Sequence, residues 1–323
     1  MTTVRIIEIS GIDYGLSLYP SYLLPLFEVE RRDKILYITK KNGTCRGLVC
    51  RSIGDKTICE IPSTCSISYA QKLLGIDKYD LFRKVLGDLG IAYRLGFTLM
   101  YSPIDKLHVI SSIYLSRNTD YYINTLRWHR VFLENKCYDS PAVCRGIFSS
   151  YVFQQFLEAY PLLSSILAVS PGRNAYGEAR RLLSIKGIGP KTISAYLLHA
   201  YGFTEHAPID RYYHRVLQRL GINGRIPPKK YCIRFLGECW KCPYNDRCLY
   251  YSASRIMGRL NGFVQSLIYI YYRLKTRKTP TRLEENLLTD KENLLAVMDE
   301  FLKELLEVIK NHYLNRDKYD EAT

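Results

Sequence analysis

Leu183-Ser-Ile-Lys-Gly-Ile-Gly-Pro-Lys-Thr192 is the stretch of sequence that decides the fold. A helix-forming run from residue 179 to 185 stops at Gly187 and Gly189, and a second helix begins at Pro190. Proline suits the first position of a helix because the N–H that it lacks would have no partner there. The pattern therefore predicts two helices joined by a tight glycine turn, a helix–hairpin–helix.

The turn of this hairpin is suited to hold a phosphate. Gly187 and Gly189 can adopt backbone conformations closed to other residues. We therefore expect the N–H groups of the turn, and those of the next helix's first turn, to point outward together. Such contacts hold the nucleic-acid backbone and carry no base sequence information. The predicted phosphate-binding residues are Lys186, Gly187, Ile188 and Gly189.

Lys191 stands in the first turn of the second helix, and Asp210 follows nineteen residues later. The positive end of the helix dipole disfavours a second positive charge, so the neutral, nucleophilic form of an amine is easier to reach there. Each residue alone has an ordinary interpretation. Lys191 is then a solvated lysine at a helix start, and Asp210 is the cap of a helix over residues 211–220.

The stretch resembles the helix–hairpin–helix (HhH-GPD) DNA glycosylase superfamily. Bifunctional members carry a lysine at the position of Lys191 and an aspartate, one helix later, at the position of Asp210. The resemblance implies an enzyme that flips out a damaged base, cleaves its N-glycosidic bond and nicks the strand. Asp210 would stabilise the cationic sugar, and Lys191 would form the Schiff base that precedes β-elimination. A monofunctional glycosylase and a non-catalytic DNA-binding protein are the alternatives.

Composition favours a partner that is a polyanion. The 323-residue chain is 47% hydrophobic, enough for two domains with cores, and its formal net charge is +15. Residues 281–323 hold six basic and eleven acidic residues, which leaves about +20 on the rest. This charge predicts double-stranded DNA, damaged or abasic, as the partner. No apolar run is long enough to span a membrane and no leader is evident, so we expect a cytoplasmic, nucleoid-associated protein.

Residues 1–112 alternate short apolar runs with turn signals, which predicts an antiparallel sheet domain. The expected strands are 4–9, 26–29, 34–39, 47–51 and 56–61, and residues 68–89 show helical spacing. A sheet domain ahead of helices resembles the 8-oxoguanine glycosylase and 3-methyladenine glycosylase II branch more than endonuclease III. The expected fold class is α+β.

Four cysteines lie in this sheet domain, and a tight turn at Gly54-Asp55 places Cys50 opposite Cys59. Intracellular disulfides are unusual outside hyperthermophiles. We therefore expect two buried free thiols, with a Cys50–Cys59 disulfide as the alternative.

Residues 113–276 are interpreted as the helical catalytic domain. A capping signal at Thr119 or Asp120 opens it. The segment is similar to the one with which superfamily members begin their helical domain. By that resemblance Arg117 and Asn118 fill the gap left by a flipped base. An ordinary solvated helix entry is the alternative.

Four more cysteines follow the spacing C-x6-C-x2-C-x5-C: Cys232, Cys239, Cys242 and Cys248. Four thiolates match the ligand number of a [4Fe–4S] cluster, whereas a structural zinc site more commonly uses two close pairs. The spacing is identical to that of the endonuclease III cluster loop, which implies one [4Fe–4S] cluster in loop 232–248. Here the loop precedes the last helix of the domain. Whether it meets DNA or braces the fold is therefore open.

The helix after the loop carries Gln265 and Tyr269, which are four residues apart and share a face. Residues 260–269 resemble the last core helix of 8-oxoguanine glycosylase, which implies a base pocket of Gln265, Tyr269 and Tyr212. A glutamine bonded to backbone is the alternative. That branch has a glycine where this chain has Tyr22, so the identity of the removed base stays open.

Residues 277–323 are expected to form a basic link and an acidic C-terminal helix. Thr289 and Glu292 fit a capping box for this helix. Its apolar seam is Leu294, Met298, Phe301, Leu305 and Val308. The seam is too short for a convincing coiled coil, so we expect it to pack on its own chain and the protein to be a monomer.

Overall fold

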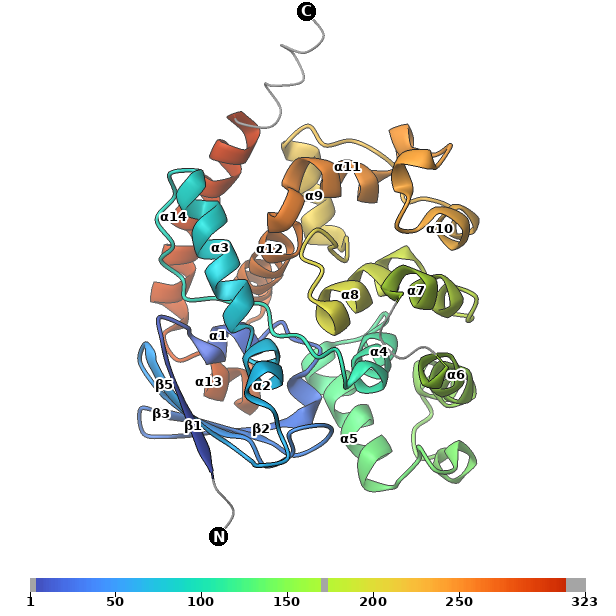
Figure 1. Ribbon diagram of the computed structural model, residues 1–323, viewed down its shortest axis with the longest axis horizontal. Helices are drawn as coiled ribbons and strands as arrows, with labels where there is room; N and C mark the ends of the chain where they lie inside the picture. The colour runs from blue at the N-terminus through green and yellow to red at the C-terminus, as the bar shows by residue number, and fades with distance from the viewer. Residues whose placement is uncertain (1–3, 170–173, 312–323) are drawn as a thin grey trace, which may run out of the picture.

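The computed structural model describes residues 4–169 and 174–311. Its N-terminal part is a five-stranded antiparallel sheet in the order β1-β5-β4-β3-β2, at the lower left of Figure 1. The strands are β1 (Arg5–Ser10), β2 (Phe27–Arg32), β3 (Ile35–Lys40), β4 (Val49–Ile53) and β5 (Lys56–Ile61). The predicted strands and their antiparallel arrangement are confirmed.

The helices of the N-terminal part lie on one side of the sheet (Figure 1). They are α1 (Tyr14–Leu18), η1 (Leu24–Leu26), α2 (Ile67–Leu73) and α3 (Ile76–Asp88). The single helix expected over residues 68–89 is two helices, because Gly75 adopts a left-handed φ of 68° that ends the first of them.

The cysteines of the sheet domain form disulfides. Cys50 pairs with Cys59 in the β4–β5 register, as predicted from the turn, with their Cα atoms 4.1 Å apart. The expectation of two free thiols is wrong, because directly opposed cysteines at this spacing lie within bonding reach. Cys45 and Cys65 form a second disulfide, and Cys137 and Cys144 a third.

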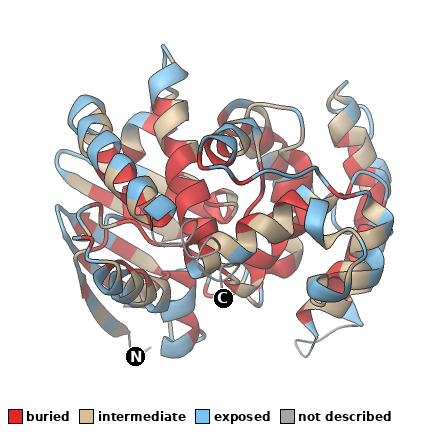
Figure 2. Ribbon diagram, turned by 90° about the horizontal axis from the view of Figure 1, so that it is seen from above, coloured by how far each residue is buried: buried red, intermediate tan, exposed pale blue. Residues whose placement is uncertain are grey.

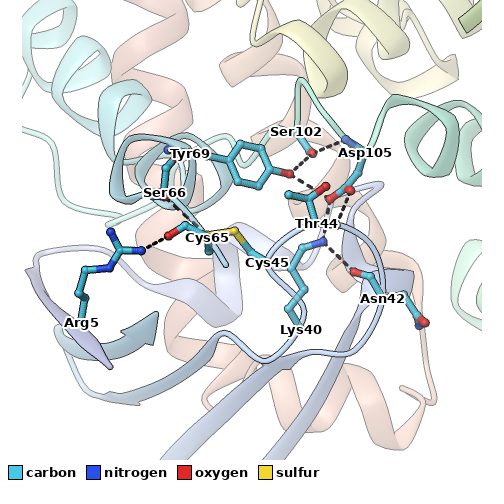
Figure 3. Close-up of a disulfide and its surroundings, with 10 residues drawn as sticks. All are labelled: Arg5, Lys40, Asn42, Thr44, Cys45, Cys65, Ser66, Tyr69, Ser102 and Asp105. Carbon is cyan, nitrogen blue, oxygen red and sulfur yellow. Dashed lines mark hydrogen bonds and ion pairs between the residues drawn. A yellow bond between two sulfur atoms is a disulfide. The ribbon is translucent and has the colours of Figure 1, made fainter. Parts of the chain in front are cut away.

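A buried ion pair beside the second disulfide ties the sheet to the helical part (Figure 3). The Lys40 ammonium lies 2.7 Å from Asp105 Oδ2, and neither side chain is more than 3% exposed. The Thr44 N–H and the Tyr69 hydroxyl also donate to this carboxylate, at 2.7 and 3.0 Å. Burial opposes ionisation, but Lys40 and the Thr44 N–H hold the pKa of Asp105 below its usual value. Asp105 directly precedes helix α4 (Lys106–Leu115), so the pair fixes where that helix starts.

The rest of the chain is helical, and α4 runs across the boundary predicted after residue 112. The elements up to the hairpin are η2 (Tyr121–Thr125), α5 (Leu126–Glu134), η3 (Pro141–Cys144), α6 (Tyr151–Ala168), α7 (Ala175–Leu183) and α8 (Pro190–Tyr201). Those after it are α9 (Arg211–Arg219), α10 (Lys229–Phe235), η4 (Cys239–Lys241), η5 (Asn245–Arg247), α11 (Leu249–Met257), η6 (Gly258–Leu260) and α12 (Asn261–Thr276). Buried residues gather at the centre of the molecule (Figure 2).

Two C-terminal helices pack back onto earlier parts of the chain. Helix α13 (Arg282–Leu287) lies against β2, where Arg31 Nε donates to the Asn286 carbonyl at 2.8 Å. Helix α14 (Lys291–Ile309) packs on α12 with Met298, Phe301 and Leu305 buried, which confirms that the apolar seam packs on its own chain.

The capping box predicted at Thr289 and Glu292 is wrong. Thr281 and Glu284 form such a box at the start of α13, and the Asp290 side chain caps α14 by accepting from Asn293 N–H. No helix in the described ranges is both long and apolar enough to cross a membrane.

Candidate active site

The predicted helix–hairpin–helix is present as α7, a turn and α8. Gly187 has a φ of 85°, a left-handed conformation that favours glycine. Gly189 has φ −130° and ψ −175°, an extended conformation open to any residue, so the expectation of a special conformation there is wrong. Because glycine has no side chain, Gly189 cannot cap α8. The N–H groups of the first turn of α8 are therefore left without a partner from the N-cap side chain.

Of the other two hairpin residues, Ile188 differs from its predicted role and Lys186 does not. The Ile188 side chain is buried at 2% exposure, and the Ile188 N–H donates to the Ile185 carbonyl at 3.2 Å. This N–H therefore closes the turn. Lys186 is exposed, as a phosphate contact requires.

Arg117 braces the hairpin. Its guanidinium lies 3.7 Å from the centroid of the Tyr114 ring and donates from Nη1 to the Gly187 carbonyl at 2.9 Å. Nη2 donates to Gln155 Oε1 at 3.1 Å. The next residue, Asn118, is exposed and has a left-handed φ of 53°. The segment predicted to fill a gap in DNA is thus held directly against the turn that is predicted to bind phosphate.

A cavity of about 1060 Å³ opens beside the hairpin. It brings together predicted residues from four separate segments of the chain. The predicted residues that line it are Arg117, Asn118, Gly187, Gly189, Lys191, Asp210, Tyr212, Gln265 and Tyr269. Lys191, at the start of α8, is exposed to it. These residues therefore meet at one site, although they are spread over positions 117 to 269 of the sequence.

The two carboxylate oxygens of Asp210 have different hydrogen-bond partners. Oδ1 accepts from the N–H groups of Tyr212 and Tyr213, at 2.8 and 2.9 Å, so Asp210 is the N-cap of α9. Oδ2 accepts from Gln265 Nε2 at 3.3 Å. The capping role considered as an alternative is therefore present, and it orients the second oxygen toward the cavity. Gln265, at 6% exposure, bonds to a carboxylate, whereas its alternative interpretation was a bond to backbone.

Aromatic residues that were not predicted complete the cavity wall. Tyr22 from the N-terminal part lies edge-on to Tyr121, with 5.6 Å between ring centroids, and edge-on to His199, with 5.1 Å. Burial, and the nearby Asp210 carboxylate, raise the pKa of Tyr22. Burial lowers the pKa of His199 to about 4, so this imidazole is neutral near pH 7. His199 lies on α8, the helix that begins beside Lys191, and no pattern in the sequence singled it out.

Two arginines at the end of α12 and just after it, Arg273 and Arg277, also line the cavity and are paired with carboxylates. Arg273 Nε lies 2.8 Å from Glu284 Oε1, and Arg277 Nη1 lies 2.7 Å from Asp120 Oδ2. Asp120 is also the N-cap of η2, which confirms the capping signal predicted at Thr119 or Asp120. These two arginines therefore tie α12 to the segment that carries Arg117.

The cysteine loop, residues 232–248, contains the four cysteines that no disulfide uses: Cys232, Cys239, Cys242 and Cys248. Burial, then the thiols of Cys248, Cys239 and Cys242, raise the pKa of Cys232 to about 12. Arg225 N–H donates to the Arg247 carbonyl at 2.7 Å and closes the loop. Among the described residues, no three or more His, Cys, Asp or Glu side chains are arranged to hold a metal ion. The four free thiols match a [4Fe–4S] cluster in the number of ligands.

Solved structures with a similar fold were found. The structure of MBOgg1 in complex with low affinity DNA ligand has a TM-score of 0.55 at 13% identity, covering 86% of this chain and 100% of its own. Clostridium acetobutylicum 8-oxoguanine glycosylase/lyase, bound to double-stranded DNA with cytosine opposite 8-oxoG, has a TM-score of 0.50 at 12% identity, covering 86% and 99%. Its apo form has a TM-score of 0.50 at 12% identity, covering 84% and 98%. No protein-family model and no curated protein sequence matches this chain. The chain therefore shares its fold with these DNA glycosylase structures.

Proposed function

We propose that this protein is a bifunctional DNA glycosylase and AP lyase of base-excision repair. The observation that carries the proposal is the meeting of Lys191, Asp210 and Gln265 in one cavity beside a phosphate-binding hairpin. The activities named for the similar structures, an 8-oxoguanine glycosylase/lyase among them, support the same reaction class.

In the proposed mechanism the hairpin holds the DNA backbone and the damaged nucleotide is flipped into the cavity. Gln265, Tyr269 and Tyr212 line the space for the base. The N-glycosidic bond breaks and its electron pair leaves with the base. Asp210 Oδ2 stabilises the positive charge that develops on the sugar.

Lys191 then carries the lyase step. Its neutral amine attacks the anomeric carbon, the sugar ring opens, and a Schiff base forms. The Schiff base acidifies the adjacent C2′–H, so a proton leaves that carbon and the 3′ phosphate departs by β-elimination. Water then hydrolyses the C=N bond of the Schiff base, which releases the unsaturated sugar aldehyde and returns Lys191 as a free amine.

A panel of duplexes tests this proposal, each with one oxidised, alkylated or deaminated base or an abasic site. Products are scored with and without alkali, which cleaves at abasic sites that the protein leaves intact. Nicking without alkali supports the bifunctional reading. Base release revealed only by alkali indicates the monofunctional alternative. Binding without either product indicates a non-catalytic DNA-binding protein.

DNA affinity should depend on the hairpin turn and on salt. We expect affinity for undamaged duplex to fall steeply with salt, because each neutralised phosphate releases roughly 0.9 counterion. Gly187→Ala should weaken binding to all sequences alike, because the Cβ would meet the Arg117 guanidinium and φ is 85°. Gly146→Ala is the matched control, since φ is 86° and nothing lies within 4 Å of its Cβ. A loss confined to some sequences would contradict a backbone-binding turn.

We further propose that the four free cysteines hold one [4Fe–4S] cluster. When bound, the cluster supplies four iron–thiolate bonds that join α10, η4 and the start of α11. The purified protein should be yellow-brown, with about four irons per chain. Cys232→Ser should lose iron and thermal stability together, because metal binding and folding are coupled at such sites. Stoichiometric zinc in protein expressed with ample iron would contradict the cluster.

A further inference from the structure

Side chains from three elements hold the carbonyl groups of the hairpin turn. The Lys229 ammonium, at the start of α10, donates to the Ile185 carbonyl at 2.9 Å. The Tyr114 hydroxyl on α4 donates to the Lys186 carbonyl at 3.0 Å. Arg117 holds the Gly187 carbonyl. Of these three donors, only Lys229 belongs to the helix that carries a cysteine of the loop.

A hydrogen bond that fixes a backbone carbonyl also fixes the N–H of the same peptide unit. The C=O and N–H of one trans peptide unit point in opposite directions. The bond from Lys229 to the Ile185 carbonyl therefore orients the N–H of Lys186, and the bond from Tyr114 orients the N–H of Gly187. In the described residues, neither N–H donates to another backbone carbonyl. Both are available to a phosphate.

The cysteine loop is packed against the first hairpin helix at two further points. A Cβ at Gly237, whose φ is 88°, would meet the Tyr176 ring of α7 at 2.6 Å. Helix α10, which carries Cys232, also packs directly on α7. The cysteine loop therefore contacts α7 directly, and it contacts the hairpin turn through Lys229.

We propose that Lys229 is a positioning residue that couples the cysteine loop to the phosphate-binding turn, so that an intact loop sets the affinity for the DNA backbone. This inference rests on the proposed function. A charge-assisted hydrogen bond to a carbonyl is strong enough to fix one peptide plane. If the loop loosens, α10 can move, Lys229 then loses its bond to the Ile185 carbonyl, and the N–H of Lys186 is no longer held in one direction.

Lys229→Met and Lys230→Met form a matched pair, because each removes one positive charge from α10. Lys230 is exposed and lies over the Tyr231 ring at 5.4 Å. Lys229→Met should lower affinity for undamaged duplex roughly ten-fold, the effect of losing a charge-assisted bond, and Lys230→Met less than about two-fold. Lys229→Arg keeps a donor and should restore most of the affinity. Thermal midpoints should match the parent in all three.

The coupling itself is tested by combining variants. Cys242→Ser disturbs the loop and should weaken duplex binding in the parent. In Lys229→Met it should cause little further loss, since the connection is already broken. Tyr114→Phe removes a holding bond that does not pass through the loop, so its effect should add to that of Cys242→Ser.

The outcomes separate this inference from the proposed function. A parent protein without salt-dependent duplex binding would overturn the proposed function. A parent that binds, with equal losses in Lys229→Met and Lys230→Met, would overturn the positioning role alone. Additive effects of Lys229→Met and Cys242→Ser would overturn the coupling.

Discussion

Lys191→Gln is expected to abolish strand nicking and to abolish covalent trapping of the protein on abasic-site DNA by borohydride. A Schiff base between a lysine amine and the opened sugar is reduced by borohydride to a stable secondary amine, and glutamine has no amine that can form one. Affinity for the duplex should stay within a few-fold, because one charge is a small part of the surplus of about +20 outside residues 281–323.

The matched control for this prediction is Lys186→Gln. It removes the same charge from an exposed lysine of the same hairpin, five residues earlier. This variant should bind DNA less tightly yet be trapped once bound. Undiminished trapping in Lys191→Gln would place the nucleophile elsewhere. No trapping in the parent on any lesion would favour the monofunctional or non-catalytic alternatives.

Asp210→Asn is expected to slow base excision by roughly two to three orders of magnitude, the usual cost of removing one preorganised charge partner of a transition state. The fold should survive, because an asparagine oxygen can still accept from Tyr212 and Tyr213 N–H and cap α9. Single-turnover base release on saturating enzyme measures the effect free of binding. The nicking of a preformed abasic site should fall less, since no base has to leave.

Asp290→Asn provides the control, because Asp290 caps α14 in the same way and lies outside the cavity. Its rate of excision should equal that of the parent. An Asp210→Asn variant that excises within a few-fold of the parent would show that the cap, and not the charge, is what the position supplies.

Local patterns predicted the fold well. Alternating residues and a tight turn at Gly54-Asp55 were enough to give the antiparallel sheet and the register of Cys50 opposite Cys59. The break at Gly75 was missed because apolar spacing continues across it. The Cys50–Cys59 disulfide was only the alternative, because the usual redox state of an intracellular protein was weighed above the geometry of the turn. The Cys45–Cys65 and Cys137–Cys144 disulfides were not predicted.

The site was predictable where its parts are close in sequence. Lys191 and Asp210 lie at the starts of neighbouring helices, so their separation of nineteen residues was sufficient to predict that they belong to one site. The bond between Gln265 and Asp210 joins residues 55 apart and depends on how α12 passes the start of α9. The place of Tyr22 in the cavity wall depends on the docking of the N-terminal part, which no local pattern records.

The packing of α13 against β2 has a consequence for the order in which the protein is made. Strand β2 is at one edge of the sheet, and Asn286 both accepts from Arg31 and donates to the Val29 carbonyl at 3.5 Å. The ribosome must therefore add more than two hundred residues after β2 before α13 exists and can pack on this edge. Throughout that interval the edge is open to pairing with another nascent strand. Completion of the first-made part of the molecule thus waits on one of the last-made helices.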